Sequence, residues 1–179
     1  NQTGPSGKII NRVYIEEATH IEKELYLGLV FDRGSECIMV VASTEGGMSV
    51  EEISQKKPES IIRSKIEVAV GMQEFQAREI AFNLGIKSEL VSRTASVIIG
   101  CSRIFSELDA TMVEINPLVI TKDSHVLALD CKMSFDNNAL FRRNNISELR
   151  DKTQENESEI YASDRGLNYV GLEGNIGNI

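Results

Sequence analysis

The sequence predicts a mixed α+β (α/β) domain with a largely antiparallel sheet. Short apolar runs bounded by turn residues alternate with longer amphipathic stretches, which is typical of strands with interposed helices. Two of these runs, at 23–32 and 37–43, are separated only by the turn signal Asp32-Arg33-Gly34-Ser35, which indicates a hairpin. The 179 residues suffice for one domain of ordinary size, or for one domain and part of another.

The composition narrows the possible functions. The net charge of −8 argues against non-specific binding to DNA or RNA, which needs clustered Lys and Arg. No apolar run approaches the ~18 residues of a membrane-spanning helix, so we expect no membrane partner. The three cysteines, Cys37, Cys101 and Cys131, form no CxxC pair and are interpreted as reduced intracellular thiols. Because the chain does not begin with Met, we expect Asn1 to be the cut end of a longer protein.

In the first half of the chain, a strand is expected at Ile9–Ile15, followed by the hairpin strands at 23–32 and 37–43. Ser49 and Glu52 match a capping box, so a short helix is expected to start at Val50 and to be interrupted or ended at Pro58. The β-branched run at 60–71 predicts another strand.

In the second half, the pattern at 72–86 predicts a helix capped by Gly85. A longer helix is expected at Ser88–Leu108, with a broad apolar stripe that would face the core. Helical potential returns near 146–165. The stretch at 167–179 is interpreted as a strand that enters a glycine-rich loop.

Between Thr111 and Lys132 the sequence predicts a second hairpin whose strands carry unexpected polar residues. If the turn is centred on Asp123, Asn116 lies opposite Asp130 and Glu114 lies opposite Lys132. Directly opposed side chains share one face, with Cβ atoms about 4.5–5.5 Å apart. Strict alternation then puts Leu118 and Ile120 on the same face as Glu114 and Asn116. The opposite face is apolar and is expected to pack on the helices: Val113, Ile115, Pro117, Val119, Leu127, Leu129 and Cys131.

An Asn amide oxygen and an Asp carboxylate at this spacing can both reach one hard cation. Mg²⁺ prefers oxygen ligands and usually shares its shell with waters and substrate phosphates. The alternative is an ordinary polar cluster, in which Glu114 pairs with Lys132 and Asn116 bonds to Asp130. Pro117 in mid-strand indicates an edge or a bulge, which would shift the register.

Several motifs in series carry a family resemblance across essentially the whole chain. The segments IEEATHIEKELYLGLVFDR, ASTEGG, EINPLVIT, LALDCK, NALFR and LNYVGLEGNIGN together resemble the β subunit of succinyl-CoA synthetase, the ADP-forming or GDP-forming succinate–CoA ligase. The resemblance implies an ATP-grasp domain followed by a flavodoxin-like CoA-ligase domain. Residues 1–165 would be the second part of the ATP-grasp region and 166–179 the truncated start of the CoA-ligase domain. The family's early nucleotide-binding lysine and phosphate loop have no counterpart here.

The resemblance also implies roles for individual residues. Asn116 and Asp130 match the Mg²⁺ ligands, and Glu114 matches the carboxylate that meets the phosphohistidine of the α subunit. Glu16, Thr19 and Glu24 match positions that contact the nucleotide, ATP or GTP. Without the resemblance, Glu16 and Glu24 would be interpreted as solvated charges.

The implied reaction converts succinate, CoA and nucleoside triphosphate to succinyl-CoA, nucleoside diphosphate and phosphate, reversibly, in a complex with the α subunit. The accepting histidine belongs on that partner, since His20 and His125 are interpreted as surface residues. We expect this chain alone to have little or no ligase activity. The enzyme would be cytoplasmic in a bacterium and in the mitochondrial matrix of a eukaryote. The alternatives are a malate–CoA ligase, a portion of ATP-citrate lyase, and a non-catalytic scaffold that reuses the fold.

Overall fold

The structure is a computed structural model that describes residue 10, residues 13–167 and residues 169–172. It divides into two compact units, Asn1–Phe135 and Asp136–Ile179. The boundary expected at 165/166 concerns the start of another domain and stays a prediction.

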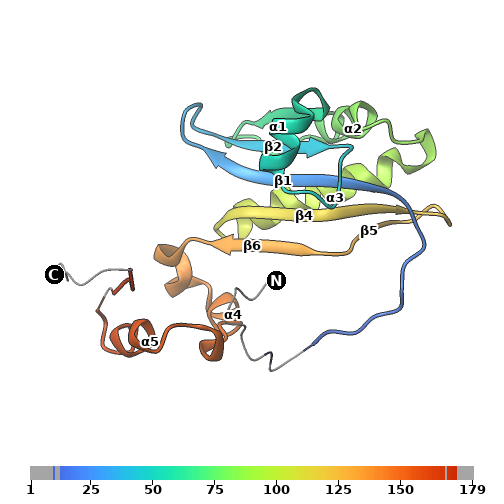
Figure 1. Ribbon diagram of the computed structural model, residues 1–179. Helices are drawn as coiled ribbons and strands as arrows, with labels where there is room; N and C mark the ends of the chain where they lie inside the picture. The colour runs from blue at the N-terminus through green and yellow to red at the C-terminus, as the bar shows by residue number, and fades with distance from the viewer. Residues whose placement is uncertain (1–9, 11–12, 168, 173–179) are drawn as a thin grey trace. The chain divides into compact units, whose positions relative to one another are not determined.

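The first unit is built on an antiparallel sheet with the strand order β3-β2-β1-β4-β5, in which β6 also pairs with β4 (Figure 1). Its strands are β1 Ile21–Asp32, β2 Cys37–Ser43, β3 Ile61–Ile66, β4 Ala110–Thr121, β5 Val126–Ala128 and β6 Cys131–Phe135. All of the strand pairs are antiparallel, and β1 and β2 form the predicted hairpin. The predicted fold class is therefore confirmed.

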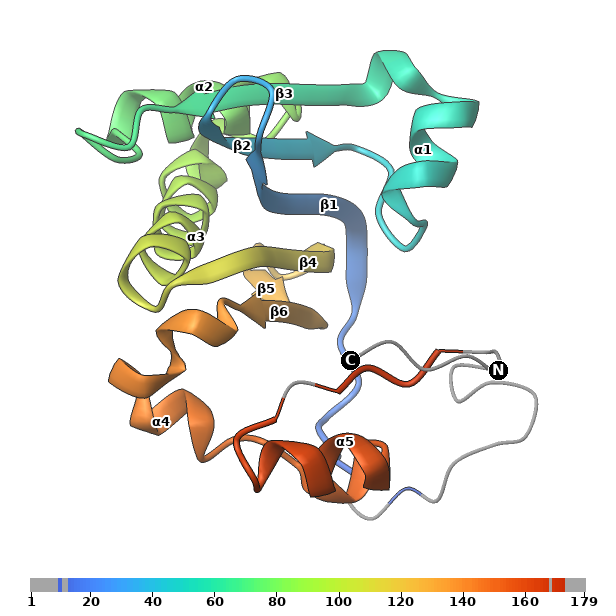
Figure 2. The ribbon, with the colours of Figure 1, turned by 90° about the vertical axis from the view of Figure 1, so that its left-hand side faces the viewer.

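Three helices complete this unit: α1 Val50–Lys56, α2 Glu74–Asn83 and α3 Ser88–Glu107. Figure 2 shows α2 and α3 on one side of the sheet and α1 on the other. The main core lies between the sheet and the long helices, where Leu25, Leu27 and Leu29 of β1 join Ile98 of α3 in one fully buried cluster. The face of the sheet that points away from α2 and α3 lies outside this core, and α1 is on that side.

Local sequence explains where the helices begin and end. The Ser49 hydroxyl accepts a hydrogen bond from the Glu52 backbone N–H at 3.3 Å and caps α1. A 3₁₀ turn at Pro58–Ser60 follows α1, as expected from a proline that cannot continue the ladder. Gly85, with φ of +65°, ends α2 in the left-handed conformation that glycine favours.

Two of the other expected strands are wrong or shortened. Ile10 and residues 13–20 have no regular structure, and Val13, Tyr14 and Ile15 are largely exposed, so no strand in the described part of the chain covers this apolar run. The other positions of the expected Ile9–Ile15 strand lie outside the described residues. The expected 60–71 strand ends at Ile66, because the backbone turns back at 67–71 through hydrogen bonds from Val70 N–H and Gly71 N–H to Glu67 O.

The strand expected at 167–179 is not present in its described part. Residues 167 and 169–172 have no regular secondary structure, and the rest of that segment lies outside the described residues.

Strand β4 contains an irregularity that changes which face its side chains occupy. Leu118 pairs with Leu25 of β1 and Ile115 pairs with Leu27, so Asn116 and Pro117 together oppose a single β1 residue. Such an extra residue is a bulge, and it reverses the alternation of side chains beyond it. The Asn116–Pro117 peptide bond is cis.

This bulge makes the expected division of faces partly wrong. Val113 and Ile115 lie in the helix-side core as expected, but beyond Pro117 it is Leu118 and Ile120 that join that core. Val119 is fully buried yet lies outside the cluster. Glu114 and Asn116 therefore do not share a face with Leu118 and Ile120.

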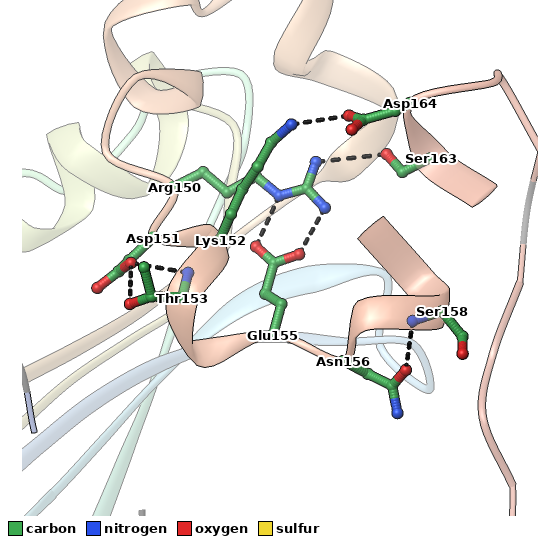
Figure 3. A network of polar contacts seen from close by, with 9 residues as sticks. All are labelled: Arg150, Asp151, Lys152, Thr153, Glu155, Asn156, Ser158, Ser163 and Asp164. Carbon is green, nitrogen blue, oxygen red and sulfur yellow. Dashed lines mark hydrogen bonds and ion pairs between the residues drawn. The ribbon is translucent and has the colours of Figure 1, made fainter. Parts of the chain in front are cut away.

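The second unit consists of short helical pieces: η2 Asn137–Arg142, α4 Asn144–Ser147, η3 Lys152–Gln154 and α5 Glu157–Ser163. Figure 3 shows the polar network around η3 and α5. The Arg150 guanidinium donates to both carboxylate oxygens of Glu155, at 2.6 and 2.5 Å, and Lys152 pairs with Asp164 at 2.7 Å. The Asn156 side chain accepts from the Ser158 N–H and caps α5. The helical potential predicted near 146–165 thus appears as short segments.

Candidate functional site at the open end of the β4 hairpin

The register predicted for the β4 hairpin is confirmed. Leu118 pairs with Ala128, and Glu114 pairs with Lys132. Between these pairs, the Asn116 N–H donates to the Asp130 carbonyl at 3.2 Å, so the two residues lie opposite each other. The bulge at Pro117 does not disturb this pairing, because β5 and β6 are interrupted at the same level, at Leu129 and Asp130.

The polar residues of this hairpin lie on the side of the sheet away from α2 and α3. Ile115 belongs to the helix-side core, so its neighbours on β4, Glu114 and Asn116, point to the other side by alternation. Asp130 lies opposite Asn116, in the irregular step between β5 and β6. Glu114 and Asn116 are half-buried, and Asp130 is exposed. The arrangement brings the amide of Asn116 and the carboxylate of Glu114 to one face, with Asp130 across from them at the open end of the hairpin.

The simple polar cluster considered as an alternative is not formed. Within the described part of the chain, no ion pair joins Glu114 to Lys132. Instead of bonding to the Asp130 carboxylate, the Asn116 side chain binds the backbone of residues 46–48, Gly46-Gly47-Met48, here termed the glycine loop. Its Oδ1 accepts from the Gly47 N–H at 2.8 Å, and its Nδ2 donates to the Met48 carbonyl at 2.9 Å.

The glycine loop also lies directly on strand β1. A Cβ added to Gly46 would come within 2.5 Å of the Leu25 backbone nitrogen, so only glycine permits this approach. A Cβ on Gly47, whose φ is +75°, would lie 2.8 Å from Oε2 of Glu24. The Glu24 carboxylate thus lies against the loop that Asn116 binds, and the loop brings these two predicted site residues to one place.

Tyr26 is a neighbour of this site that sequence reasoning missed. The side chain is only 4% exposed, and its hydroxyl would lie 2.7 Å from a Cβ on Gly28, the residue that pairs with Glu114. Burial first, and then the negative charges of Glu114 and Glu51, raise the pKa of Tyr26 to about 12. The available signal was alternation, since Leu25 and Leu27 face the core and leave Tyr26 on the site's face.

Glu16 and Thr19 are not brought into contact with the other predicted residues. Both lie in the irregular segment before β1, where Glu16 is exposed and Thr19 half-buried. The end of this segment is fixed to the hairpin turn, because the Lys122 N–H donates to the His20 carbonyl at 2.9 Å. No hydrogen bond among the described residues joins Glu16 or Thr19 to Glu114, Asn116 or Asp130.

The donor set suits a magnesium ion that a phosphate ligand helps to hold. Asn116 Oδ1 has a second lone pair besides the one used by Gly47, and the Asp130 carboxylate is accessible. The described residues contain no group of three or more His, Cys, Asp or Glu side chains that could hold a metal ion by itself. Mg²⁺ is often bound through only one or two protein oxygens together with waters and substrate phosphates, and this pair fits that pattern.

None of the helices in the described part of the chain has the length and apolar character needed to cross a membrane.

Comparison with curated proteins identifies relatives that are longer than this chain. It is 58% identical over 178 residues to a probable malate–CoA ligase subunit beta from Mesorhizobium japonicum, covering 99% of this chain and 45% of that protein. It is 49% identical over 177 residues to the ADP-forming succinate–CoA ligase subunit beta of Bacillus subtilis, covering 99% and 46%. The chain thus spans about half the length of the curated relatives it matches.

Solved structures share the fold. An ATP citrate lyase from Methanosaeta concilii, in complex with (3S)-citryl-CoA, superposes with a TM-score of 0.52 at 14% identity, covering 82% of this chain and 33% of that one. The sequence profile of the ATP-grasp domain matches residues 1–120, which is more than half of the chain. This chain therefore belongs to the ATP-grasp domain family.

Proposed function

We propose that this chain is part of the nucleotide-binding β subunit of a succinate–CoA ligase. The single observation that carries the proposal is the opposition of Asn116 and Asp130 at the open end of the hairpin, next to the pair of Glu114 with Lys132. The identity of about 50% to succinate–CoA ligase β subunits over 99% of the chain supports it. The reaction would convert succinate, CoA and nucleoside triphosphate to succinyl-CoA, nucleoside diphosphate and phosphate.

In this proposal the first chemical step transfers a phosphoryl group to a histidine of the partner α subunit. Asn116 and Asp130 would hold the magnesium ion that accompanies ATP or GTP. When bound, the ion supplies charge neutralisation between the phosphate oxygens. Glu114 would accept a hydrogen bond from the second ring nitrogen of the accepting imidazole, and so orient it and raise its nucleophilicity.

Glu24, Glu16 and Thr19 would contact the nucleoside portion. Glu24 is the one supported by geometry, because its carboxylate lies against the glycine loop beside Asn116. A carboxylate there can accept hydrogen bonds from ribose hydroxyls. Residues 166–179 would lead into a CoA-ligase domain, and the complete enzyme would work in the bacterial cytoplasm or, in a eukaryote, in the mitochondrial matrix.

A phosphoryl-transfer assay with the complete β subunit and the α subunit tests this function. Combining Asn116→Ala with Asp130→Ala should lower phosphorylation of the α subunit by at least about 10²-fold, the range seen when a group that stabilises transition-state charge is removed. The matched control is His125→Ala at the exposed hairpin turn, which should leave phosphorylation unchanged. Unchanged phosphorylation in the double variant would contradict the assignment of Asn116 and Asp130 as metal ligands, and no phosphorylation by the wild type would support a non-catalytic scaffold instead.

A malate–CoA ligase is a second candidate, because the relative with that name shares 58% identity with this chain, against 49–50% for the succinate–CoA ligases. The nucleotide half of the chemistry would be the same in both enzymes. Rates of acyl-CoA formation by the complete enzyme with succinate and with malate decide between them.

A further inference from the structure

The glycine loop is fixed at both ends by its own neighbours. Before it, the Ser43 hydroxyl accepts from the Glu45 N–H at 3.2 Å and bonds to the Ser60 hydroxyl at 2.9 Å. After it, Ser49 caps α1. The backbone of residues 46–48 itself has no partner in these flanking elements.

Asn116 supplies the missing partner from a different part of the sequence. Within the described residues, its side chain makes the only hydrogen bonds to the backbone of the glycine loop, one to Gly47 and one to Met48. The two bonds use both ends of one amide, so they define the position of the loop above β4. The close approach of Gly46 to the backbone of β1 defines it above the neighbouring strand.

The loop in turn limits where the Glu24 carboxylate can lie. Oε2 of Glu24 is so close to Gly47 that a Cβ there would meet it at 2.8 Å. Movement of the loop away from the sheet would therefore remove the surface against which this carboxylate rests. A chain of contacts runs from Asn116 on β4, through Gly47, to Glu24 on β1.

We propose that Asn116 is a positioning residue that holds the glycine loop on the sheet, and that this loop sets the place of the Glu24 carboxylate. The two hydrogen bonds to residues 47 and 48 carry this inference. It rests on the proposed function only in taking Glu24 as a nucleotide contact. Asn116 then has two separable tasks, one toward a cation and one toward the loop.

Amide hydrogen exchange followed by NMR in the nucleotide-free chain tests the loop task. Asn116→Ala should make the Gly47 amide exchange roughly tenfold faster, because its acceptor is lost. Asn116→Asp should restore the protection, since it keeps an oxygen acceptor for that N–H. The matched control is Asp130→Ala, which removes the opposite candidate metal ligand but no bond to the loop, and it should leave the Gly47 exchange unchanged.

A second variant reaches the loop without touching Asn116. Gly46→Ala introduces a Cβ against the backbone of β1, so it should also accelerate exchange at Gly47 and shift the side-chain carboxyl resonance of Glu24. Gly34→Ala in the β1–β2 turn, where a Cβ would meet its nearest atom at an ordinary 3.5 Å, is the control and should change neither signal. Exchange at Leu27 in the core reports on whether each variant is folded.

The proposal is overturned if the Gly47 amide exchanges as an unprotected amide in the wild type. It is equally overturned if folded Asn116→Ala and Gly46→Ala both keep the wild-type exchange rate and the wild-type Glu24 resonance. Because these measurements contain no nucleotide or metal, a failure of the proposed ligase function would leave their outcome unaffected.

Discussion

Asn116 shows how much of this site depends on one side chain. Its backbone N–H joins β4 to Asp130, and its amide joins β4 to the glycine loop. Asp130 differs, since its exposed carboxylate makes no hydrogen bond or ion pair with another described residue. Two residues that would share one cation thus have very different structural roles.

This difference predicts the effect of Asp130→Ala on stability. Because no bond is lost from its exposed carboxylate, the free energy of unfolding should change by no more than about 0.5 kcal/mol. Urea unfolding of the wild type and the variant measures it. A loss above about 2 kcal/mol would mean that Asp130 has a structural role, and the argument that it is kept for a ligand would fail.

The raised pKa of Tyr26 predicts a pH dependence of stability. Burial and the nearby carboxylates raise it from 10.0 to about 12, so between these values the folded chain holds a proton that the unfolded chain has released. The stabilising contribution is complete below pH 10 and is lost as the pH rises through about 12. The free energy of unfolding of the wild type should therefore fall more steeply above pH 10 than that of Tyr26→Phe. Parallel curves would contradict the assigned environment.

At the scale of elements, the sequence predicts those strands and helices that begin or end at a local signal. The β1–β2 hairpin follows from its turn residues, and α1 begins where Ser49 caps it. The sequence could not predict which side chains of β4 beyond Pro117 face the helices. Pro117 indicates an irregularity, but it does not indicate whether the alternation of side chains is reversed. Only the pairing of β4 with β1 determines that Leu118 and Ile120, and not Val119, face the helices.

Helix α3 allows a prediction about the core, which lies on the other side of the sheet from Glu114 and Asn116. Ile98 is fully buried between this helix and the sheet, so Ile98→Ala should lower the free energy of unfolding by about 2–5 kcal/mol through lost contacts and a cavity. Ser106→Ala on the exposed side of the same helix is the control, with an expected change within about 0.5 kcal/mol. Equal effects in chemical unfolding would contradict the assignment of the core face.

At the scale of the whole molecule, the sequence predicted the class of the fold and the opposition of Asn116 and Asp130, since a turn at Asp123 is enough to set the register. It could not predict that the glycine loop joins Asn116 to Glu24, because this contact connects residues nearly 70 positions apart, with separations of 69 and 68. Tyr26 was missed for a similar reason, because its relation to Glu114 depends on the pairing of β1 with β4. Local pattern defines elements, and long-range pairing assembles the site.

The central claim is that Asn116 and Asp130 together hold a divalent cation that accompanies a nucleotide. Paramagnetic broadening of amide NMR signals by Mn²⁺ with ATP tests it most directly, because Mn²⁺ accepts the same oxygen ligands as Mg²⁺. The account predicts that the backbone amide signals of positions 116, 130 and 47 broaden first in the wild type, and that the signals of the same positions stay sharp in the Asn116→Ala, Asp130→Ala double variant. Broadening centred elsewhere, or equal broadening in the double variant, would contradict it.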